Sequence, residues 1–442
     1  MGGPSIVWLR DDLRLADNPA LTAAAERGEP VVLVYVLDEE SEGIRPLGAA
    51  SRWWLHGSLA ALGEQLVLKR GRAEDAIPAL VAETGAGAVF WNRRYGASRE
   101  IDARLKALLR EAGLDVRSFQ ANLLVEPWTL TTGSGRPYRV FTPFWKAARE
   151  LPVRAPLPEP NVEWASAKSD TLDDLQLLPT RPDWAEGLRE TWHPGEEGAH
   201  AQLESFVDER LENYHRRDEP AVDGTSRLSP HLRFGEISPF QIWDRLHGAM
   251  SRAAQANVAK FLSEVGWREF NWSILFHSPE LAERNYRPAY DAFPWSEADP
   301  DELAAWREGR TGIPLVDAGM RELWHTGIMH NRVRMVVASF LIKNLLVDWR
   351  VGEKWFWDTL VDADEASNPG NWQWVAGSGA DAAPYFRVFN PELQREKFDK
   401  GGRYVNRWVP EYGTPLYPEP IVDLAETRRR ALAAYDHVRA SV

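Results

Sequence analysis

The sequence has no cysteine among its 442 residues. This absence excludes disulfides, thiolate metal sites, iron–sulfur clusters and cysteine nucleophiles. A chain without disulfides suits the cytoplasm. The sequence also lacks an N-terminal signal with a basic and an apolar part, and it has no apolar run long enough to span a bilayer. We therefore expect a cytoplasmic protein that makes no membrane contact.

Positive charge is also scarce. Lys and Arg number 52 against 65 Asp and Glu, which gives a net charge of −13. An acidic chain argues against nucleic-acid binding, because phosphates require cations. A basic face can nevertheless lie on an acidic body, so the distribution of charge decides. Tryptophan is abundant, with 21 residues. The length predicts two domains.

The first part of the sequence alternates strand and helix patterns. Short apolar runs at 6–9, 31–36, 66–68 and 88–91 alternate with helical patterns at 19–27, 50–62, 73–83 and 99–112. This order predicts a doubly wound parallel sheet with helices on both faces. No Gly-x-Gly-x-x-Gly follows the first strand, so a dinucleotide cradle is not expected there. We interpret the Arg/Asp cluster at 10–18 as an ion-paired structural turn.

Prolines punctuate residues 151–194, which is typical of a connector between domains. From about residue 198 the patterns are helical, with segments at 201–216, 258–276, 314–325, 333–346, 354–361 and 426–442. We expect an α/β domain over 1–130, a linker over 131–197 and an all-helical domain over 198–442, with about ten helices in the last.

One candidate anion site precedes an apolar helical segment. Thr225, Ser226 and Ser229 bring hydroxyls next to Arg227. Hydroxyls and free N–H groups at a helix start can bind a diphosphate. The alternative is a plain helix cap, and this segment alone favours the cap.

A second candidate lies on the predicted helix at 258–276. Its spacing of three and four residues brings Glu264, Trp267, Arg268 and Asn271 to one face. A carboxylate beside an indole suits a planar polar ligand. The alternative is an amphipathic helix with a Glu264–Arg268 surface pair.

Two further segments carry polar groups. The run at 330–335 can bind phosphates and base edges, or it can cap a helix. Asp362 and Asp364 suggest a metal loop, but their spacing fails the EF-hand pattern, so a carboxylate that accepts from a heterocycle N–H is an equal alternative. We expect no metal. The run at 381–391 resembles a buried turn.

Six segments occur in the order found in one known family. They read Trp-Leu-Arg-Asp-Asp-Leu-Arg-Leu at 8–15, Thr-Ser-Arg-Leu-Ser-Pro at 225–230, Trp-Arg-Glu-Phe at 267–270, Met-His-Asn-Arg-Val-Arg-Met at 329–335, Asn-Trp-Gln-Trp at 371–374 and Asp-Ala-Ala-Pro-Tyr-Phe-Arg at 381–387. Together they resemble the photolyase/cryptochrome family over essentially the whole chain. The resemblance implies a Rossmann-like antenna domain, a linker and an all-helical FAD-binding domain.

The resemblance implies one FAD, reduced in the active state. Arg334 would pair with Asp362 in a buried salt bridge, and the Asn368 amide would lie next to flavin N5 as a donor that supplies no proton. The implied FAD-binding residues are Tyr214, Thr225, Ser226, Arg227, Leu228, Ser229, Phe261, Arg268, Arg334, Asp362, Asp364 and Asn368.

The resemblance further implies light-driven repair of cyclobutane pyrimidine dimers, since the stretch at 329–332 differs from the His pair of relatives that act on (6–4) photoproducts. Glu264 and Asn368 would take part in the reaction, and Trp372, Trp349 and Trp295 would carry electrons to the flavin. Trp357 or another indole is the alternative to Trp295. The implied contacts to flipped-out DNA are Glu264, Trp267, Asn271, Asn331, Arg332, Met335, Trp374 and Gln394. A cryptochrome-type blue-light receptor and a (6–4) photolyase are the alternatives.

A second, light-gathering chromophore is implied for the first domain. The segments at 45–56 and 91–95 resemble the bacterial class III branch, which suggests 5,10-methenyltetrahydrofolate, with 8-hydroxy-5-deazaflavin as the alternative. We expect UV-damaged DNA as the partner, no obligate protein partner and a monomer. The cations expected to face DNA are Arg332, Arg334, Lys343, Arg387, Arg395, Lys397, Lys400, Arg403 and Arg407.

Overall fold

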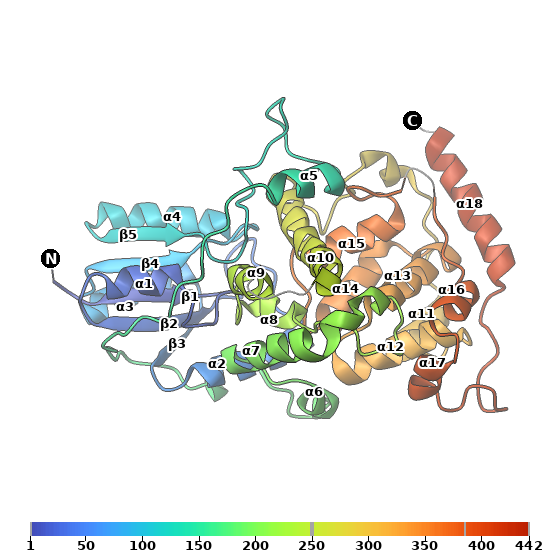
Figure 1. The fold of residues 1–442 in the computed structure, drawn as a ribbon, viewed down its shortest axis with the longest axis horizontal. Coiled ribbons are helices and arrows are strands. Elements are labelled where there is room, and N and C mark those ends of the chain that lie inside the picture. Colours follow the sequence, from blue (N-terminus) through green and yellow to red (C-terminus); the bar gives the residue numbers. More distant parts are fainter. Residues whose placement is uncertain (1, 248–251, 384–385, 441–442) are drawn as a thin grey trace.

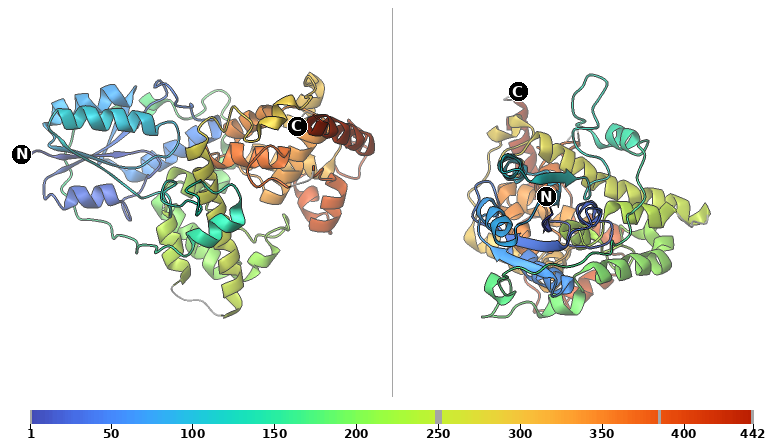
Figure 2. Two further views of the ribbon diagram at one scale, coloured as in Figure 1. Left: turned by 90° about the horizontal axis from the view of Figure 1, so that it is seen from above. Right: turned by 90° about the vertical axis from the view of Figure 1, so that its left-hand side faces the viewer.

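The structure is a computed structural model that describes residues 2–247, 252–383 and 386–440. A parallel sheet with its helices lies at one end of the molecule, and a larger helical region forms the rest (Figures 1 and 2). This arrangement confirms the α/β plus all-α fold class predicted from the sequence.

The sheet has five parallel strands in the order β3-β2-β1-β4-β5. β1 pairs with β2 through Ser5 and Val31, and with β4 through Ser5 and Ala88. The sequence did not reveal β5, because only Val116 of its five residues is fully buried and the others are polar or half-buried. Such a composition is normal for an edge strand. The strands are β1 (Ser5–Leu9), β2 (Val31–Leu37), β3 (Leu66–Arg70), β4 (Ala88–Asn92) and β5 (Asp115–Phe119).

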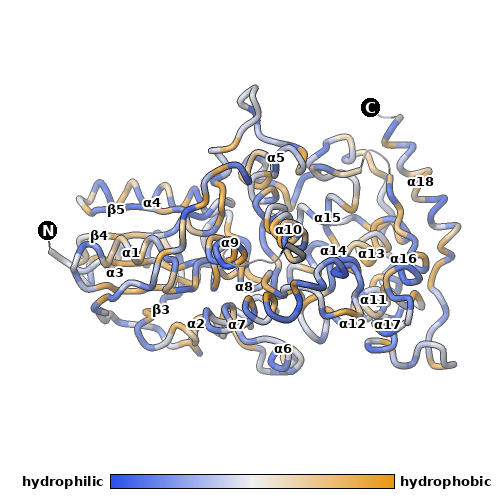
Figure 3. The backbone as a smooth tube through the Cα atoms, in the orientation of Figure 1, coloured by the Kyte–Doolittle hydropathy of each residue, from blue (hydrophilic) through white to orange (hydrophobic). Residues whose placement is uncertain are grey.

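Helices cover both faces of the sheet. Side chains on a strand alternate, so Val7 and Leu9 of β1 belong to one hydrophobic cluster while Ile6 and Trp8 belong to another. Hydrophobic residues run through the strands, whereas hydrophilic residues are frequent on the outer helices (Figure 3). The covering helices are α1 (Pro19–Ala25), α2 (Ala49–Leu62), α3 (Ala73–Thr84) and α4 (Arg99–Glu111).

The Arg/Asp turn after β1 is structural, as predicted. The Arg14 side chain is fully buried and donates to the carbonyl oxygens of Asp17 and Gly235, at 2.8 Å for the latter. Arg10 pairs with Asp102 at 3.3 Å. Since Gly235 belongs to the helical region, this turn also joins the two parts of the chain.

The connector wraps back over the sheet before the helical region begins. The backbone N–H of Val31 donates to the carbonyl of Glu163 at 2.8 Å. A loop projects from the molecule just before α5 (Figure 1). The helices of this stretch are α5 (Phe141–Ala148) and α6 (Glu186–Thr191). The domain boundaries at 130 and 197 stay predictions.

The helical region contains twelve α-helices among the described residues, somewhat more than the sequence indicated. Two expected helices are interrupted. α7 passes into a π-helical turn at Phe206–Arg210 and a 3-10 turn at Leu211–Arg216, and α13 passes into a π-helical turn at Phe340–Asn344. The apolar pattern alone cannot distinguish these turns from a continuous α-helix.

The bounds of these helices are α7 (Glu196–Ser205), α8 (Ser229–Phe234), α9 (Pro239–His247), α10 (Arg252–His277), α11 (Pro300–Glu308), α12 (Pro314–Thr326), α13 (Asn331–Ser339), α14 (Trp349–Thr359), α15 (Ser367–Ala376), α16 (Pro391–Phe398), α17 (Arg403–Trp408) and α18 (Leu424–Ala440). Of the helices in the described ranges, none combines the length and the apolar character needed to cross a membrane.

Candidate functional site

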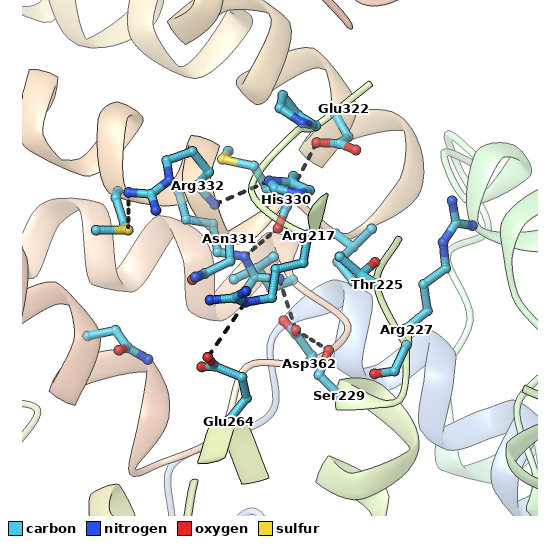
Figure 4. Close-up of a pocket in the computed structure, with 18 of the residues that line it drawn as sticks. Arg217, Thr225, Arg227, Ser229, Glu264, Glu322, His330, Asn331, Arg332 and Asp362 are labelled. Carbon is cyan, nitrogen blue, oxygen red and sulfur yellow. Dashed lines mark hydrogen bonds and ion pairs between the residues drawn. The ribbon is translucent and has the colours of Figure 1, made fainter. Parts of the chain in front are cut away.

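A large cavity lies inside the helical region, between α10, α13, α14 and α15 (Figure 4). Its volume of about 1230 Å³ exceeds the range of roughly 300–1,000 Å³ that is usual for small-molecule sites. Such a cavity can hold a ligand larger than an ordinary metabolite. Nearly all of the predicted cofactor and lesion residues line it, although they come from segments far apart in the sequence.

The predicted anion segment lies at one side of the cavity. The Ser226 carbonyl accepts a hydrogen bond from the Gln202 side chain at 2.8 Å, which fixes the loop. Arg227 has a positive φ of 55°, and its guanidinium group is well exposed. α8 has only six residues, so the hydroxyls and Arg227, rather than a helix dipole, provide the attraction for an anion.

A buried carboxylate faces this segment. Asp362 accepts a hydrogen bond from Arg334 at 2.9 Å and another from Ser229 at 2.7 Å. Figure 4 shows Asp362 and Ser229 pointing toward each other. The salt bridge expected between Arg334 and Asp362 is therefore present. The second oxygen of Asp362, Oδ1, is buried and has no partner within the protein. Since buried polar atoms are normally satisfied, this oxygen is suited to accept from an N–H of a ligand.

Asp364, the second predicted carboxylate, also lines the cavity. Its side chain accepts from the backbone N–H groups of Ala366 and Ser367 at 2.8 and 2.5 Å. These bonds cap the start of α15 and so fix the position of Asn368 one turn later. No group of His, Asp and Glu suited to a metal ion occurs within the described part of the chain.

Asn368 is buried, and its side-chain nitrogen donates both of its hydrogen bonds within the protein. Nδ2 donates to the backbone carbonyl of Glu353 at 3.0 Å and to Oε1 of its side chain at 2.8 Å. The amide group left for a ligand is therefore the oxygen, an acceptor. The expected donor role is wrong, because Glu353 satisfies both hydrogens of this amide.

The predicted face of α10 does point into the cavity. Glu264 pairs with Lys260 at 2.8 Å and lies 3.8 Å from Arg217, whereas Arg268 pairs with Glu269 at 3.4 Å. A Glu264–Arg268 surface pair is thus not what holds this face. Asn271 also lines the cavity and packs against Gly370, where a Cβ atom would come within 3.0 Å of the Asn271 side chain.

The start of α13 caps its own helix, which is one of the two purposes considered for it. His330 Nδ1 accepts from the backbone N–H of Arg332 at 3.2 Å and caps the helix. Burial lowers the pKa of His330 to about 4, so the imidazole is neutral at pH 7. The Arg332 side chain pairs with Asp218 at 3.0 Å and approaches the Met335 sulfur at 3.8 Å. Asn331 lies on the exposed side of the cavity wall.

Several cavity residues were missed from the sequence, among them Glu322, Tyr404 and Arg217. Glu322 accepts from Tyr404 Oη at 2.6 Å and from the His330 backbone at 3.1 Å, and burial raises the pKa of its carboxyl. Arg217 faces Glu264 across the cavity in Figure 4. No local pattern marks these side chains, since folding alone brings their segments together.

The two predicted tryptophans on α15 both line the cavity. Trp374 lines the cavity and donates to the Asp381 carbonyl at 3.2 Å, which orients the ring. Trp372 lines the cavity with only 2% of its surface exposed. It packs over Gly352, where a Cβ would lie 2.1 Å from the indole, so only glycine allows α14 and α15 to approach this closely.

The two tryptophans predicted as outer members of an electron-transfer chain do not line the cavity. Trp349 is fully buried and donates to Asn285 Oδ1 at 2.9 Å. Trp295 is half-buried against Phe293, with ring centroids 4.3 Å apart. Gln394, on α16, is half-buried and does not line the cavity. The roles of these three residues stay predictions.

Only some of the cations expected to face DNA are exposed to solvent. Four of them are exposed on α16, α17 and the turn between them, namely Lys397, Lys400, Arg403 and Arg407. Of these, Arg407 lines the cavity. Lys343 differs, because its side chain is buried and donates to the carbonyl of Arg387. Its expected place on a DNA-facing rim is therefore wrong.

Two family models match the chain. The model described as DNA photolyase covers residues 5–161, and the one described as FAD binding domain of DNA photolyase covers residues 261–415. A protein of Agrobacterium fabrum named deoxyribodipyrimidine photo-lyase is 51% identical over 99% of this chain and 98% of its own length. Cryptochrome-1 of Arabidopsis thaliana is 39% identical over 93% of this chain and 63% of its own length.

Solved structures agree with these matches. A class III photolyase from Agrobacterium tumefaciens has a TM-score of 0.95 and 50% identity, covering 100% of this chain and 98% of that one. A photolyase from Sulfolobus tokodaii, described with two FAD molecules, has a TM-score of 0.84 and 30% identity, covering 98% of this chain and 99% of that one. The chain belongs to the photolyase/cryptochrome family and carries the FAD-binding domain of DNA photolyase.

Proposed function

We propose that this protein repairs cyclobutane pyrimidine dimers in DNA under light. The main supporting observation is that one cavity is lined both by the residues suited to FAD and by the carboxylate, amide and indoles suited to a planar lesion. A ligand and a substrate bound in one cavity would be close enough for direct electron transfer between them.

The residues present fit FAD. The hydroxyls of 225–229 and Arg227 suit a diphosphate, and the unpartnered Asp362 Oδ1 suits a heterocycle N–H. Bound FAD in its reduced form would supply the light-excited electron donor that opens the cyclobutane ring. Tyr214, Leu228, Phe261 and Arg268 line the same cavity and would enclose the cofactor.

The chain's own residues would prepare the lesion. Glu264 is held by Lys260 and Arg217, so its carboxylate is fixed at the cavity wall and can accept from the N–H or O–H groups of a base. Trp267 and Trp374 would provide apolar faces for the flipped pyrimidines and exclude water. Asn271, Asn331, Arg332 and Met335 would complete the wall, and the exposed cations at 397–407 would bind phosphates.

Electron supply to the cofactor would use buried indoles. Trp372 borders the cavity, and Trp349 and Trp295 would connect it to the surface. Several short transfers between buried rings would replace one long transfer. The half-buried position of Trp295 suits the outermost member of such a chain.

For the antenna we propose 5,10-methenyltetrahydrofolate, with 8-hydroxy-5-deazaflavin as the alternative. The likeness to a class III photolyase supports the first choice, while the Sulfolobus tokodaii photolyase with two FAD molecules shows that relatives differ in this respect. The absorption spectrum of chromophores released from the purified protein would identify the antenna. We further propose that the protein acts as a monomer without an obligate protein partner.

A blue-light receptor of the cryptochrome type is the second candidate. The observation that favours it is the 39% identity to Cryptochrome-1 of Arabidopsis thaliana. The intact lesion wall of Glu264, Trp267 and Met335 favours repair instead. A (6–4) photolyase is the remaining alternative.

The deciding experiment is repair of a thymine-dimer oligonucleotide under blue light, with a dark control and the Glu264→Ala variant. Light-dependent return of thymine absorbance, slowed in the variant, would support dimer repair. FAD binding and photoreduction without repair of this oligonucleotide would contradict it. A (6–4) oligonucleotide would then distinguish the other repair activity from signalling.

A further inference from the structure

Arg45 reaches from the first domain into the helical region. It lies just before α2, and its Nη1 and Nη2 donate to Oε1 and Oε2 of Glu353 on α14 at 2.7 and 2.9 Å. The guanidinium also lies over the Trp357 ring, 3.9 Å from its centroid. The Glu353 side chain is only 2% exposed and that of Arg45 is 27% exposed. A two-point pair of this kind fixes the carboxylate in one orientation.

Glu353 in turn fixes the amide of Asn368. Both hydrogens of Nδ2 have an acceptor on Glu353, one on the backbone carbonyl and one on the carboxylate. Turning the amide over would place Oδ1 against two oxygens, which is unfavourable in a buried site. The amide therefore has one orientation, with Oδ1 as the group available to a cavity ligand.

An acceptor at this position distinguishes two forms of a flavin. N5 of the oxidised isoalloxazine has a lone pair and no hydrogen, whereas N5 of the reduced ring has a hydrogen. An amide oxygen can accept from the second and repels the first. A donor would have the opposite preference.

We propose that Arg45 is a positioning residue which, through Glu353, holds Asn368 as an acceptor and so makes the site prefer the reduced flavin. This rests on the proposed function and on the position beside flavin N5 that the family resemblance implies for Asn368. The consequence is that a side chain of the first domain controls the redox preference of a cofactor bound in the helical region.

Loss of Arg45 would release this arrangement. Glu353 would become a buried carboxylate without its cation, which favours a protonated or rotated side chain. A protonated Glu353 can donate to Asn368 Oδ1, and the amide could then turn its nitrogen toward the ligand. The interface itself would remain, because Ala49 N donates to Asp358 at 2.9 Å and Trp357 Nε1 donates to the Pro46 carbonyl at 2.9 Å.

The test compares Arg45→Ala and Arg45→Lys with the unchanged protein, each in the presence and absence of Asn368→Ala. The readout is the rate at which the photoreduced, protein-bound flavin reoxidises in the dark, followed by visible absorbance, together with the FAD content of each sample. Arg104→Ala is the control, because Arg104 makes a two-point pair of the same geometry with Glu74, at 2.8 and 3.1 Å, on the exposed surface of the first domain.

We expect Arg45→Ala to reoxidise about 3- to 10-fold faster, Arg45→Lys to show an intermediate rate, and Arg104→Ala to match the unchanged protein. With Asn368→Ala already present, Arg45→Ala should add nothing. An equal acceleration in both backgrounds would overturn the proposal, since Arg45 would then act without Asn368.

The two proposals can fail separately. An unchanged protein that binds no FAD would contradict the proposed function. A protein that binds and photoreduces FAD, but whose Arg45→Ala and Arg45→Lys variants reoxidise at the original rate, would contradict only this inference. Should Arg45→Ala lose its far-UV circular dichroism, Arg45→Lys, which keeps the charge, decides the question.

Discussion

The indole of Trp267 stacks on the ring of Phe141, with centroids 3.9 Å apart and planes 9° apart. Trp267 projects from α10 and lines the cavity, while Phe141 begins α5, which follows the projecting loop of the connector. Phe141 therefore supports the back of a ring whose front would contact the lesion. A wall prepared in this way loses little rotamer freedom on binding.

Replacing Phe141 should weaken binding of damaged DNA. We expect Phe141→Leu to raise the Kd for a dimer-containing oligonucleotide by about 2- to 12-fold, the effect of losing an aromatic stack. Fluorescence anisotropy would measure this, with Phe141→Tyr as the control that keeps the stack. Equal affinity of the Leu variant and the unchanged protein would show that Trp267 needs no support.

Arg334 should matter for cofactor affinity. Arg334→Met leaves the Asp362 carboxylate without its cation, so the acceptor that would face the flavin is destabilised or protonated. We expect FAD binding to weaken at least about 10-fold, since breaking a buried pair is strongly unfavourable. Titration of FAD fluorescence would measure the Kd, and Arg334→Lys should retain much of the affinity. An unchanged Kd in Arg334→Met would show that the Arg334–Asp362 pair does not contribute to FAD binding.

Lys343 should make stability depend on pH. Burial lowers the pKa of Lys343 to about 7, below its value in the unfolded chain. Between these two pKa values the unfolded chain binds the additional proton, so the contribution of Lys343 to stability rises with pH from about 7 to about 10.5. Below pH 7 both states are protonated, and the full cost of burying the charge remains.

Lys343→Met removes this contribution. The thermal midpoint of the unchanged protein should therefore rise relative to that of the variant as pH increases from 7 to 10. Comparing the two proteins at each pH cancels the contributions of the other titrating groups to the thermal midpoint. A difference that stays constant across this range would show that Lys343 remains charged in the folded state.

Trp372 should control photoreduction. Trp372→Phe keeps an aromatic ring at the cavity wall but removes the readily oxidised indole. We expect flavin photoreduction to slow at least about 10-fold, while dimer repair by chemically reduced protein is little changed. Time-resolved absorbance would measure the rate, with Trp164→Phe, at an exposed tryptophan of the connector that does not line the cavity, as the control. Equal rates in Trp372→Phe and the unchanged protein would exclude Trp372 from the pathway.

Local spacing determined much of the candidate site. Glu264, Trp267, Arg268 and Asn271 share one face of α10 because their separations of three and four residues fix their directions on any α-helix. In the same way, alternation of apolar runs and helical patterns was sufficient to predict a parallel sheet covered on both faces.

Tertiary structure decided the burial and the hydrogen-bonding roles of side chains whose partners are distant in the sequence. Whether Lys343 is a surface cation or a buried one, and whether Asn368 offers a donor or an acceptor, follows from segments that pack against them. β5 escaped prediction because an edge strand needs little apolar surface. Arg45 and Glu353 are separated by 308 residues, and no sequence pattern marks their pairing. The sequence by itself therefore determined most of the elements and the directions of their side chains. Only packing set burial and hydrogen-bond partners, and with them the chemistry that each polar group presents.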